Sequence, residues 1–484
     1  MWRNRLRAAE QVLEPGLSAG PGRRPTVWFE VEDFLRYFEN FPTPTGLQRV
    51  AFEIYAEAER LYGRTGAVKF CRLSIYTRQL MPVEFEAIAS AYTNPPGIKA
   101  PWKTIWAPAR FLRNLPSALL TIMGHPGFFL SILKSAFADI LAARSQRRRF
   151  EQSIKPGDIV VSLGAPWGIP CYMDHIARAK ERYGVKFAIL IHDLIPLEHE
   201  SFVEPWHVVR FRDWLSTAIA NANIVLTMSM YSRSALIAAA ADRQWSLPAI
   251  EALQPGTIMS RQPETPDRTA PDWTAAKFPE RFVLFVSTIE IRKNHQFLVR
   301  VWRRLLQRHG AEAVPDLIFA GQLGWKVDGL LTELEAGNYL DGKIQLRRNL
   351  SDAALRQAYS SCQFTIFPSL CEGWGLPVAE SLVQGKICVA SNRTSIPEVG
   401  GDFVDYFDPT DENDALAKIE RLLFEPGYLQ KRETRLRNEY SPPTWANCVL
   451  SFMAALDRAA ADSKRYLQDS AIRQRARHDI IDVA

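Results

Sequence analysis

Residues Phe364–Asp408 read FTIFPSLCEGWGLPVAESLVQGKICVASNRTSIPEVGGDFVDYFD, and this stretch decides the fold of the chain. Its hydrophobic pattern predicts a buried strand, a loop with two glycines, a short helix and a second buried strand. These four pieces lie at Phe364–Phe367, Ser369–Gly375, Val378–Gln384 and Ile387–Ala390. Pro377 suits the start of the helix, because its missing N–H has no partner there, and Gly385 ends the helix. This order is typical of a parallel α/β sheet.

The glycine loop is the predicted ligand site. Ligands of parallel sheets bind beyond the carboxyl ends of the strands, which places Leu370–Leu376 at the ligand. The following helix presents free N–H groups and a positive dipole end, which suit a phosphate. Glu372 in the loop and Glu380 in the predicted first helical turn offer oxygens to sugar hydroxyls. A solvated loop acid and a helix-stabilising acid are the alternatives for each residue alone. The joint arrangement indicates a nucleotide-sugar site.

The loop also resembles the E-x7-E region of the retaining glycosyltransferases of family 4, which have the GT-B fold. The matching residues are Glu372, Gly373, Gly375, Leu376, Pro377 and Glu380. Donor-binding residues are therefore predicted at Gly373, Trp374, Gly375, Leu376, Pro377 and Glu380. Glu372 is expected to contact the transferred sugar, and Glu380 the ribose.

Composition bounds the class of protein. A chain of 484 residues is too long for one core, and 47% hydrophobic with 23% charged residues is a globular composition. The six cysteines form no CxxC pair, which favours buried thiols over disulfides or a zinc site. The N-terminal residues lack the apolar core of a signal peptide, and no uninterrupted apolar run is long enough to span a membrane. A cytoplasmic protein without a metal or another cofactor is therefore expected.

Alternating strands and helices predict a first Rossmann-like domain over residues 1–256. Gly46 and Arg49 begin a predicted helix and are candidate donor contacts, with a surface loop and an exposed arginine as the equal alternative. This segment resembles the TGIxRV segment of family 4 enzymes that build bacterial surface polysaccharides. His192 follows the predicted strand Phe187–Ile191 at its carboxyl end, which makes it a candidate catalytic group. Three roles stay open for His192: a general acid or base, a hydrogen-bond donor to the sugar, or a structural histidine.

A second α/β rhythm predicts a nucleotide-sugar-binding domain over residues 281–445, after a proline-rich linker at 257–280. Arg292 and Lys293 follow its first predicted strand and match the RKN segment of family 4. The resemblance implies that Lys293 binds the donor diphosphate and stabilises the leaving group. A solvated lysine is the alternative. Family members also have an arginine about one turn earlier, where this chain has Ser287 and Thr288, so Arg292 or Arg49 is the candidate for that phosphate contact. Residues 446–484 are predicted to form a helix that returns to the first domain, as in the GT-B fold.

Residues 84–155 interrupt the first domain with a basic and partly apolar insertion. Between residues 101 and 155, nine basic residues stand against two acidic ones, so this segment alone exceeds the +6 net charge of the chain. Its apolar centre is broken at His125–Gly127 and is flanked by tryptophan and arginine, which fits a segment lying in an anionic membrane surface. An insertion that packs on the first domain with a solvated basic face is the nearly equal alternative.

These features predict an α/β protein of GT-B architecture, with two Rossmann-like domains facing a cleft. The predicted reaction transfers a sugar from a nucleoside diphosphate sugar to a glycan or lipid-linked glycan in bacterial surface polysaccharide synthesis. The resemblance to family 4 implies that the anomeric configuration is retained. The predicted catalytic residues are His192, Lys293 and Glu372, and nucleic acid is not an expected partner. The alternatives are an inactive GT-B protein that binds glycans or acts as a scaffold, and a phosphorylase, for which no pyridoxal-phosphate lysine context is evident.

Overall fold

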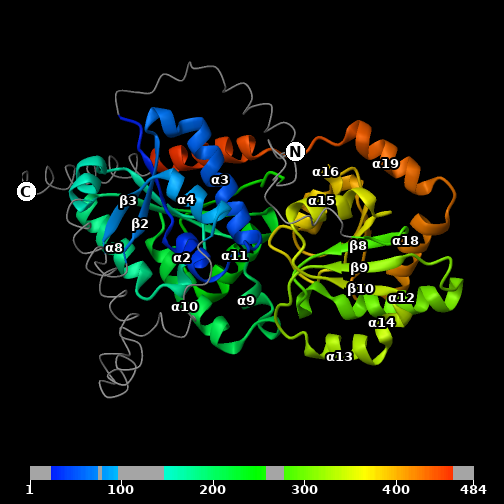
Figure 1. Ribbon diagram of the computed structural model, residues 1–484. Helices are drawn as coiled ribbons and strands as arrows, with labels where there is room; N and C mark the ends of the chain where they lie inside the picture. The colour runs from blue at the N-terminus through cyan, green and yellow to red at the C-terminus, as the bar shows by residue number, and fades with distance from the viewer. Residues whose placement is uncertain (1–22, 75–78, 96–145, 258–276, 462–484) are drawn as a thin grey trace, which may run out of the picture.

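The computed structural model describes residues 23–74, 79–95, 146–257 and 277–461. They form two α/β domains that lie side by side (Figure 1). A seven-stranded sheet underlies the first domain and a six-stranded sheet the second. Their strands fall inside the two predicted ranges, 1–256 and 281–445.

The first sheet has the order β3-β2-β1-β4-β5-β6-β7, and all neighbours are parallel except β2 and β3. Its strands are β1 (Val27–Glu30), β2 (Val68–Leu73), β3 (Leu80–Val83), β4 (Ile159–Ser162), β5 (Lys186–Ile191), β6 (Ile224–Thr227) and β7 (Ala249–Ala252). The central strands are buried on both faces, which explains their nearly continuous apolar sequences.

Helices cover both faces of this sheet, so alternate residues along a strand are buried in two separate cores. Val27 and Phe29 of β1 belong to one core, and Trp28 between them belongs to the other. The helical elements of this domain are α2 (Glu32–Asn40), α3 (Gly46–Tyr62), η2 (Gly63–Thr65), α4 (Phe85–Thr93), a helix at 146–153, η4 (Pro166–Gly168), α8 (Tyr172–Tyr183), α9 (Ile195–Glu198), η5 (Glu200–Phe202), α10 (Pro205–Asn221) and α11 (Met230–Arg243).

The second sheet is parallel throughout, in the order β10-β9-β8-β11-β12-β13. Its strands are β8 (Phe282–Val286), β9 (Asp316–Ala320), β10 (Ile344–Arg347), β11 (Thr365–Phe367), β12 (Cys388–Ser391) and β13 (Asp405–Phe407). The helical elements are η8 (Ile291–Lys293), α12 (His295–His309), α13 (Asp328–Ala336), α14 (Asn338–Asp341), α15 (Asp352–Ser361), α16 (Leu376–Val383), α17 (Ile396–Gly400), η9 (Gly401–Phe403), α18 (Glu412–Phe424) and α19 (Tyr428–Glu439).

A helix at 445–461 follows the second domain in sequence but packs on the first domain (Figure 1, red). Phe452 stacks on Phe29 of β1 with 5.6 Å between the ring centres, and Leu456 lies in the same core. Lys186 at the start of β5 also donates to the carbonyl of Ala460. The apolar face of this helix is thus buried by the domain from which it is most distant in sequence.

Several details differ from the sequence predictions. Glu380 was predicted in the first turn of its helix. Because α16 begins at Leu376, Glu380 lies in the second turn instead. α4 and the helix at 146–153 lie inside the predicted insertion 84–155, and Phe150 is buried in a core of the first domain. The described end of the insertion therefore packs on that domain, whereas residues 96–145 lie outside the described part of the chain. The linker segment 258–276 and residues 462–484 lie outside it too.

Candidate functional site

Two neighbouring strands of the second sheet bring the predicted charged residues together. β8 and β11 pair in parallel, so the loops that follow them leave the sheet at the same edge. The loop after β8 leads into η8, which carries Arg292 and Lys293. The loop after β11 carries Glu372. The sheet topology therefore explains how residues far apart in sequence form one site.

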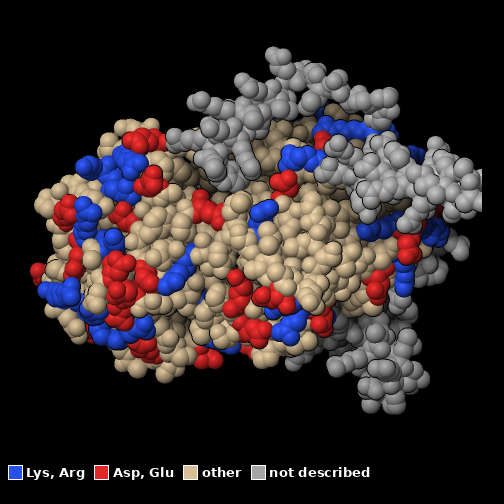
Figure 2. All heavy atoms as spheres, turned by 180° about the vertical axis from the view of Figure 1, so that it is seen from behind, with Lys and Arg blue, Asp and Glu red and all other residues tan. Residues whose placement is uncertain are grey.

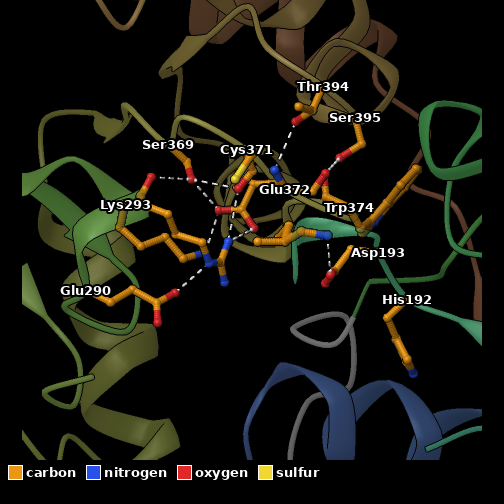
Figure 3. Close-up of polar contacts among 12 residues, drawn as sticks. His192, Asp193, Glu290, Lys293, Ser369, Cys371, Glu372, Trp374, Thr394 and Ser395 are labelled. Carbon is orange, nitrogen blue, oxygen red and sulfur yellow. Dashed lines mark hydrogen bonds and ion pairs between the residues drawn. The ribbon is translucent and has the colours of Figure 1, made fainter. Parts of the chain in front are cut away.

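Glu372 is the centre of a buried cluster of ion pairs (Figure 3). One of its carboxylate oxygens accepts hydrogen bonds from the Lys293 ammonium and from the Ser369 hydroxyl, the latter at 2.6 Å. The other oxygen accepts from Arg292 Nη1 at 2.9 Å, and Arg292 Nε contacts Glu290 at 2.7 Å. Two positive and two negative charges thus offset each other in a largely buried site.

Burial and pairing shift the pKa values of this cluster. Burial raises the pKa of Glu372, but the charges of Arg292 and Lys293 outweigh it and hold the pKa at about 2. Burial and the charge of Arg292 lower the pKa of Lys293, against the opposing effect of Glu372. Burial lowers the pKa of Arg292, but Glu372 and Glu290 outweigh burial and raise it. Glu372 is therefore ionised at neutral pH and acts only as an acceptor.

Both cations offer more donors than these pairs use. A lysine has three N–H groups and an arginine has five. The side chain of Arg292 is 22% exposed and that of Lys293 is 9% exposed. An anion such as a diphosphate can therefore accept hydrogen bonds from both residues while Glu372 keeps them oriented.

Thr394 and Ser395 fix the glycine loop from its other side (Figure 3). The N–H of Glu372 donates to the Thr394 hydroxyl at 2.9 Å. The Ser395 hydroxyl contacts the carbonyls of Glu372 and Trp374, both at 2.9 Å. Thr394 has a φ of 55°, a left-handed conformation that is rare for a β-branched residue. Such strain persists only where the surroundings impose the backbone conformation. The contacts between Thr394 and Ser395 and the glycine loop are therefore part of what holds both segments in place.

Gly375 turns the loop into α16. Its φ of 113° is unfavourable for any residue with a side chain, and Pro377 occupies the first turn of the helix. In the first turn of α16, Pro377 has no N–H and the N–H of Val378 donates to the Gly375 carbonyl at 3.0 Å. The N–H of Leu376 and the positive end of the helix dipole are therefore what this end of α16 offers to an anion. Trp374 is 7% exposed, and its indole N–H has no hydrogen-bond partner among the described residues.

The first domain reaches this helix through α3. Arg49 forms an ion pair with Asp352 of the second domain at 2.9 Å. Burial raises the pKa of Glu380, and the charge of Arg49 opposes this effect, as does the hydroxyl of Tyr359, which donates to Glu380 at 2.9 Å. A side chain at Gly46 would contact the Leu376 side chain at 3.5 Å. The structure thus brings Gly46 and Arg49 to α16, next to Glu380.

His192 follows β5 at the boundary between the domains, but its ring does not join the cluster. Figure 3 shows the ring pointing away from Glu372. Its Nε2 lies 2.7 Å from the carbonyl of Leu163, an acceptor, so Nε2 carries the proton. Burial lowers the pKa of His192, which keeps the ring neutral at pH 7. A Cβ at Gly373 would lie 2.4 Å from the His192 carbonyl oxygen, so the glycine loop packs on the backbone here.

Sequence interpretation missed residues that complete the site. They are Glu290, Tyr359, Asp352, Ser369, Thr394 and Ser395. Ser369 stands three residues before Glu372, and Glu290 stands three residues before Lys293. This proximity in sequence is a signal that could have identified them. Tyr359 and Asp352 come from α15 and have no comparable signal in the sequence.

Within the described ranges, no group of three or more histidine, cysteine, aspartate or glutamate residues is arranged to hold a metal ion. In the same ranges, no helix combines the length and apolar character needed to cross a bilayer.

Residues 272–440 match the family model of the Glycosyl transferases group 1. An O-antigen chain mannosyltransferase B of Escherichia coli is 29% identical over 49% of this chain and 60% of its own length. A serotype-specific mannosyltransferase WbdA of the same organism is 28% identical over 35% of this chain and 21% of its own length. The chain therefore spans less than two thirds of these relatives.

A solved glycosyltransferase from Rickettsia africae ESF-5 has a similar fold over 91% of this chain and 99% of its own, with a TM-score of 0.52 and 13% identity. This likeness, together with one parallel and one mostly parallel sheet, shows the GT-B fold. Residues 272–440 are therefore a glycosyl transferases group 1 domain, set within a two-domain GT-B architecture.

Proposed function

We propose that this protein is a retaining glycosyltransferase that moves a hexosyl group from a nucleoside diphosphate sugar to a glycan or lipid-linked glycan. The carrying observation is the Arg292–Lys293–Glu372 cluster, which lies beside the N-terminus of α16 in the group 1 domain. The positive charges of Arg292 and Lys293 and the positive end of the α16 dipole converge there, and both stabilise a leaving diphosphate.

In this proposal, Arg292 and Lys293 bind the diphosphate, and their charge stabilises it most as the bond to the sugar breaks. Glu372 holds both cations in place and offers its one remaining lone-pair site to a sugar hydroxyl. Glu380 binds the ribose hydroxyls. The neutral ring of His192 serves as a hydrogen-bonding group near the sugar, and the leaving phosphate takes the proton of the acceptor.

The relatives named above support a mannosyl donor and a role in bacterial surface polysaccharide synthesis, because both are mannosyltransferases. A glycan acceptor, attached to a lipid carrier and used at the inner face of the plasma membrane, completes the proposal. The basic segment 101–155 would then bring the enzyme to an anionic membrane.

The test is a binding and turnover screen of the purified protein against UDP-, GDP-, ADP- and dTDP-sugars, with each mannosyl donor included. One nucleotide is expected to bind clearly best, and its sugar to be hydrolysed slowly without acceptor and transferred faster with one. Lys293→Ala should lower turnover about 10²–10³-fold, whereas Lys431→Ala, at an exposed position on α19, should leave turnover unchanged. Binding without any turnover would instead support an inactive glycan-binding or scaffold protein. An absence of nucleotide binding would refute the donor site.

A further inference from the structure

Glu398 of α17, in the second domain, makes two hydrogen bonds to the first domain. Its Oε2 accepts from the backbone N–H of Met230 at 2.7 Å, and its Oε1 accepts from that of Tyr231 at 2.7 Å. These two N–H groups open α11, a helix of 14 residues. One carboxylate of one domain thus caps a helix of the other.

Glu398 supplies acceptors for N–H groups that have no acceptor within α11. The side chain of Ser229, the N-cap residue, accepts from the N–H of Ser232 at 3.0 Å and does not cap the two N–H groups before it. The two preceding N–H groups lack partners within a helix and, in this structure, are taken by Glu398. A carboxylate also interacts favourably with the positive end of the helix dipole, so this contact is stronger than a neutral hydrogen bond.

The segment that leads into α17 also holds the glycine loop, called the donor loop below. Thr394 and Ser395, a few residues before Glu398, bond the backbone of Glu372 and Trp374. A movement of α17 relative to the first domain would therefore be transmitted to the loop that carries Glu372.

The first domain provides the matching link. The hydroxyl of Ser232, in the first turn of α11, donates to the His192 carbonyl at 3.3 Å. This is the carbonyl against which Gly373 packs. The capped helix end, the end of β5 and the glycine loop thus form a closed ring of contacts across the two domains.

We propose that Glu398 is a positioning residue, which holds the domains in the arrangement that sets the donor loop against the end of β5. The proposal rests on the proposed glycosyl transfer. In it, Glu398 does not touch donor or acceptor, and its loss lowers the fraction of enzyme in which the two halves of the site are in register.

The experiment compares Glu398→Gln and Glu398→Asp with Tyr231→Phe. Gln keeps the size of the side chain but has one acceptor oxygen and no charge, whereas Asp keeps the charge with a shorter reach. Tyr231→Phe is the matched control, because it removes the hydroxyl bonded to Glu198 at 3.0 Å and leaves the N–H of residue 231 unchanged. Donor affinity, kcat, KM and the radius of gyration with bound donor are measured for each, and thermal melting checks folding.

Glu398→Gln is expected to bind donor within about twofold of wild type, but to lose roughly tenfold or more in kcat/KM for transfer. Its radius of gyration with donor should exceed that of wild type, and Glu398→Asp should recover part of both properties. Equal values of kcat/KM and radius of gyration in Glu398→Gln and Tyr231→Phe would overturn the proposal. So would a loss of donor affinity as large as the loss of kcat/KM, because the role of Glu398 would then be local to the donor loop. If wild type turns over no donor, the proposed function fails, but the radius of gyration still tests the cap.

Discussion

At the scale of single residues, the environment of Glu372 makes it a poor general base. Its pKa of about 2 leaves it with almost no affinity for a proton at neutral pH. Its oxygens are already bonded to Lys293, Ser369 and Arg292. A carboxylate bound in this way serves best as a fixed acceptor that orients two cations.

Lys293→Ala tests the electrostatic part of this arrangement. The change removes a charge that stabilises the leaving diphosphate, and loss of such a donor typically costs about 2.7–4 kcal/mol, or about 10²–10³-fold in kcat. Glu372 keeps its bonds to Arg292 and Ser369, so the fold should survive. Steady-state kinetics with saturating donor measure the effect, with Lys431→Ala as the control. A kcat within threefold of wild type would show that Lys293 has no part in the chemistry.

Glu372→Gln and Glu380→Gln are expected to affect different properties of the enzyme, turnover and nucleotide affinity. Glu372→Gln weakens the attraction for Arg292 and Lys293, so we expect kcat to fall at least tenfold with a smaller change in nucleotide affinity. Glu380→Gln should mainly weaken nucleotide binding, because this residue lies next to Tyr359 and Arg49, apart from the ion cluster. Calorimetric titration with free nucleotide and single-turnover rates separate the two effects. Small and equal effects would contradict the assignment of this loop as the donor site.

At the scale of secondary structure, local patterns predicted the elements well, because each predicted strand is a continuous apolar run between turn residues. The predicted strands Phe187–Ile191 and Phe364–Phe367 differ from β5 and β11 by one residue at one end. The short edge strands β3, β7 and β13 were missed, because edge strands are only partly buried and these sequences carry no clear pattern. Pairing between β8 and β11 was the decisive unknown, since no local signal states which strands lie side by side.

The candidate site shows the same division. Arg292, Lys293 and Glu372 were found from loop positions and resemblance, and the structure does bring them together. Their partners in other segments, such as Thr394 and Asp352, depend on tertiary packing and left no trace in the local sequence. His192 was placed correctly at a strand end, but the direction of its ring is set by the Leu163 carbonyl on the neighbouring strand's loop.

The carboxyl end of β1 offers a prediction about stability and pH. Glu30 is fully buried, and its oxygens accept from the N–H groups of Glu32 and Leu73 and from the Tyr172 hydroxyl. Burial, with the nearby charge of Asp33, raises its pKa from 4.5 to about 8. The unfolded chain therefore loses this proton first as the pH rises. The stability that Glu30 contributes is complete below pH 4.5 and is lost as the pH approaches 8.

Glu30→Gln removes this titration while keeping the size of the side chain. The unfolding free energy of the variant, relative to wild type, should rise between pH 5 and pH 8 by up to about 1.4 kcal/mol per pH unit and level off above pH 8. Denaturant unfolding at several pH values measures the difference, and Glu439→Gln, at an exposed position on α19, is the control. A difference that does not change with pH would show that Glu30 is ionised in the folded protein.

At the scale of the whole molecule, the close approach of the two domains depends on Gly373. A Cβ at this position would lie 2.4 Å from the His192 carbonyl oxygen and 2.9 Å from the Asp193 Cβ, well inside ordinary contact distance. Gly373→Ala should therefore hold the domains apart and lower kcat/KM by up to about 100-fold, because small displacements of reacting groups are costly. Gly168→Ala, which meets nothing within 4 Å, is the control. Unchanged kinetics and an unchanged radius of gyration would show that the loop can move independently of the domains.

The distribution of charge bears on how the molecule would meet a membrane. On the face shown in Figure 2, basic and acidic side chains are interspersed over the described surface, and neither sign dominates. The excess of positive charge in the sequence lies instead between residues 101 and 155. Attraction to an anionic surface would thus be local, and screening by salt would weaken it.

The described end of that segment permits a sharp test of membrane attachment. Arg147 pairs with Glu151, whereas Arg148 and Arg149 are exposed beside the buried Phe150. Each basic residue near an anionic surface contributes about 1 kcal/mol, so replacing Arg148 and Arg149 by glutamine should weaken binding by about 2 kcal/mol, or roughly 30-fold. Wild type should float with vesicles rich in anionic lipid at low salt, and less of it at high salt. Replacing Arg435 and Arg437 of α19 removes the same charge from the other domain and should change little. If wild type stays in solution with anionic vesicles at low salt, the basic segment is a solvated face of the first domain and the membrane plays no part in its role.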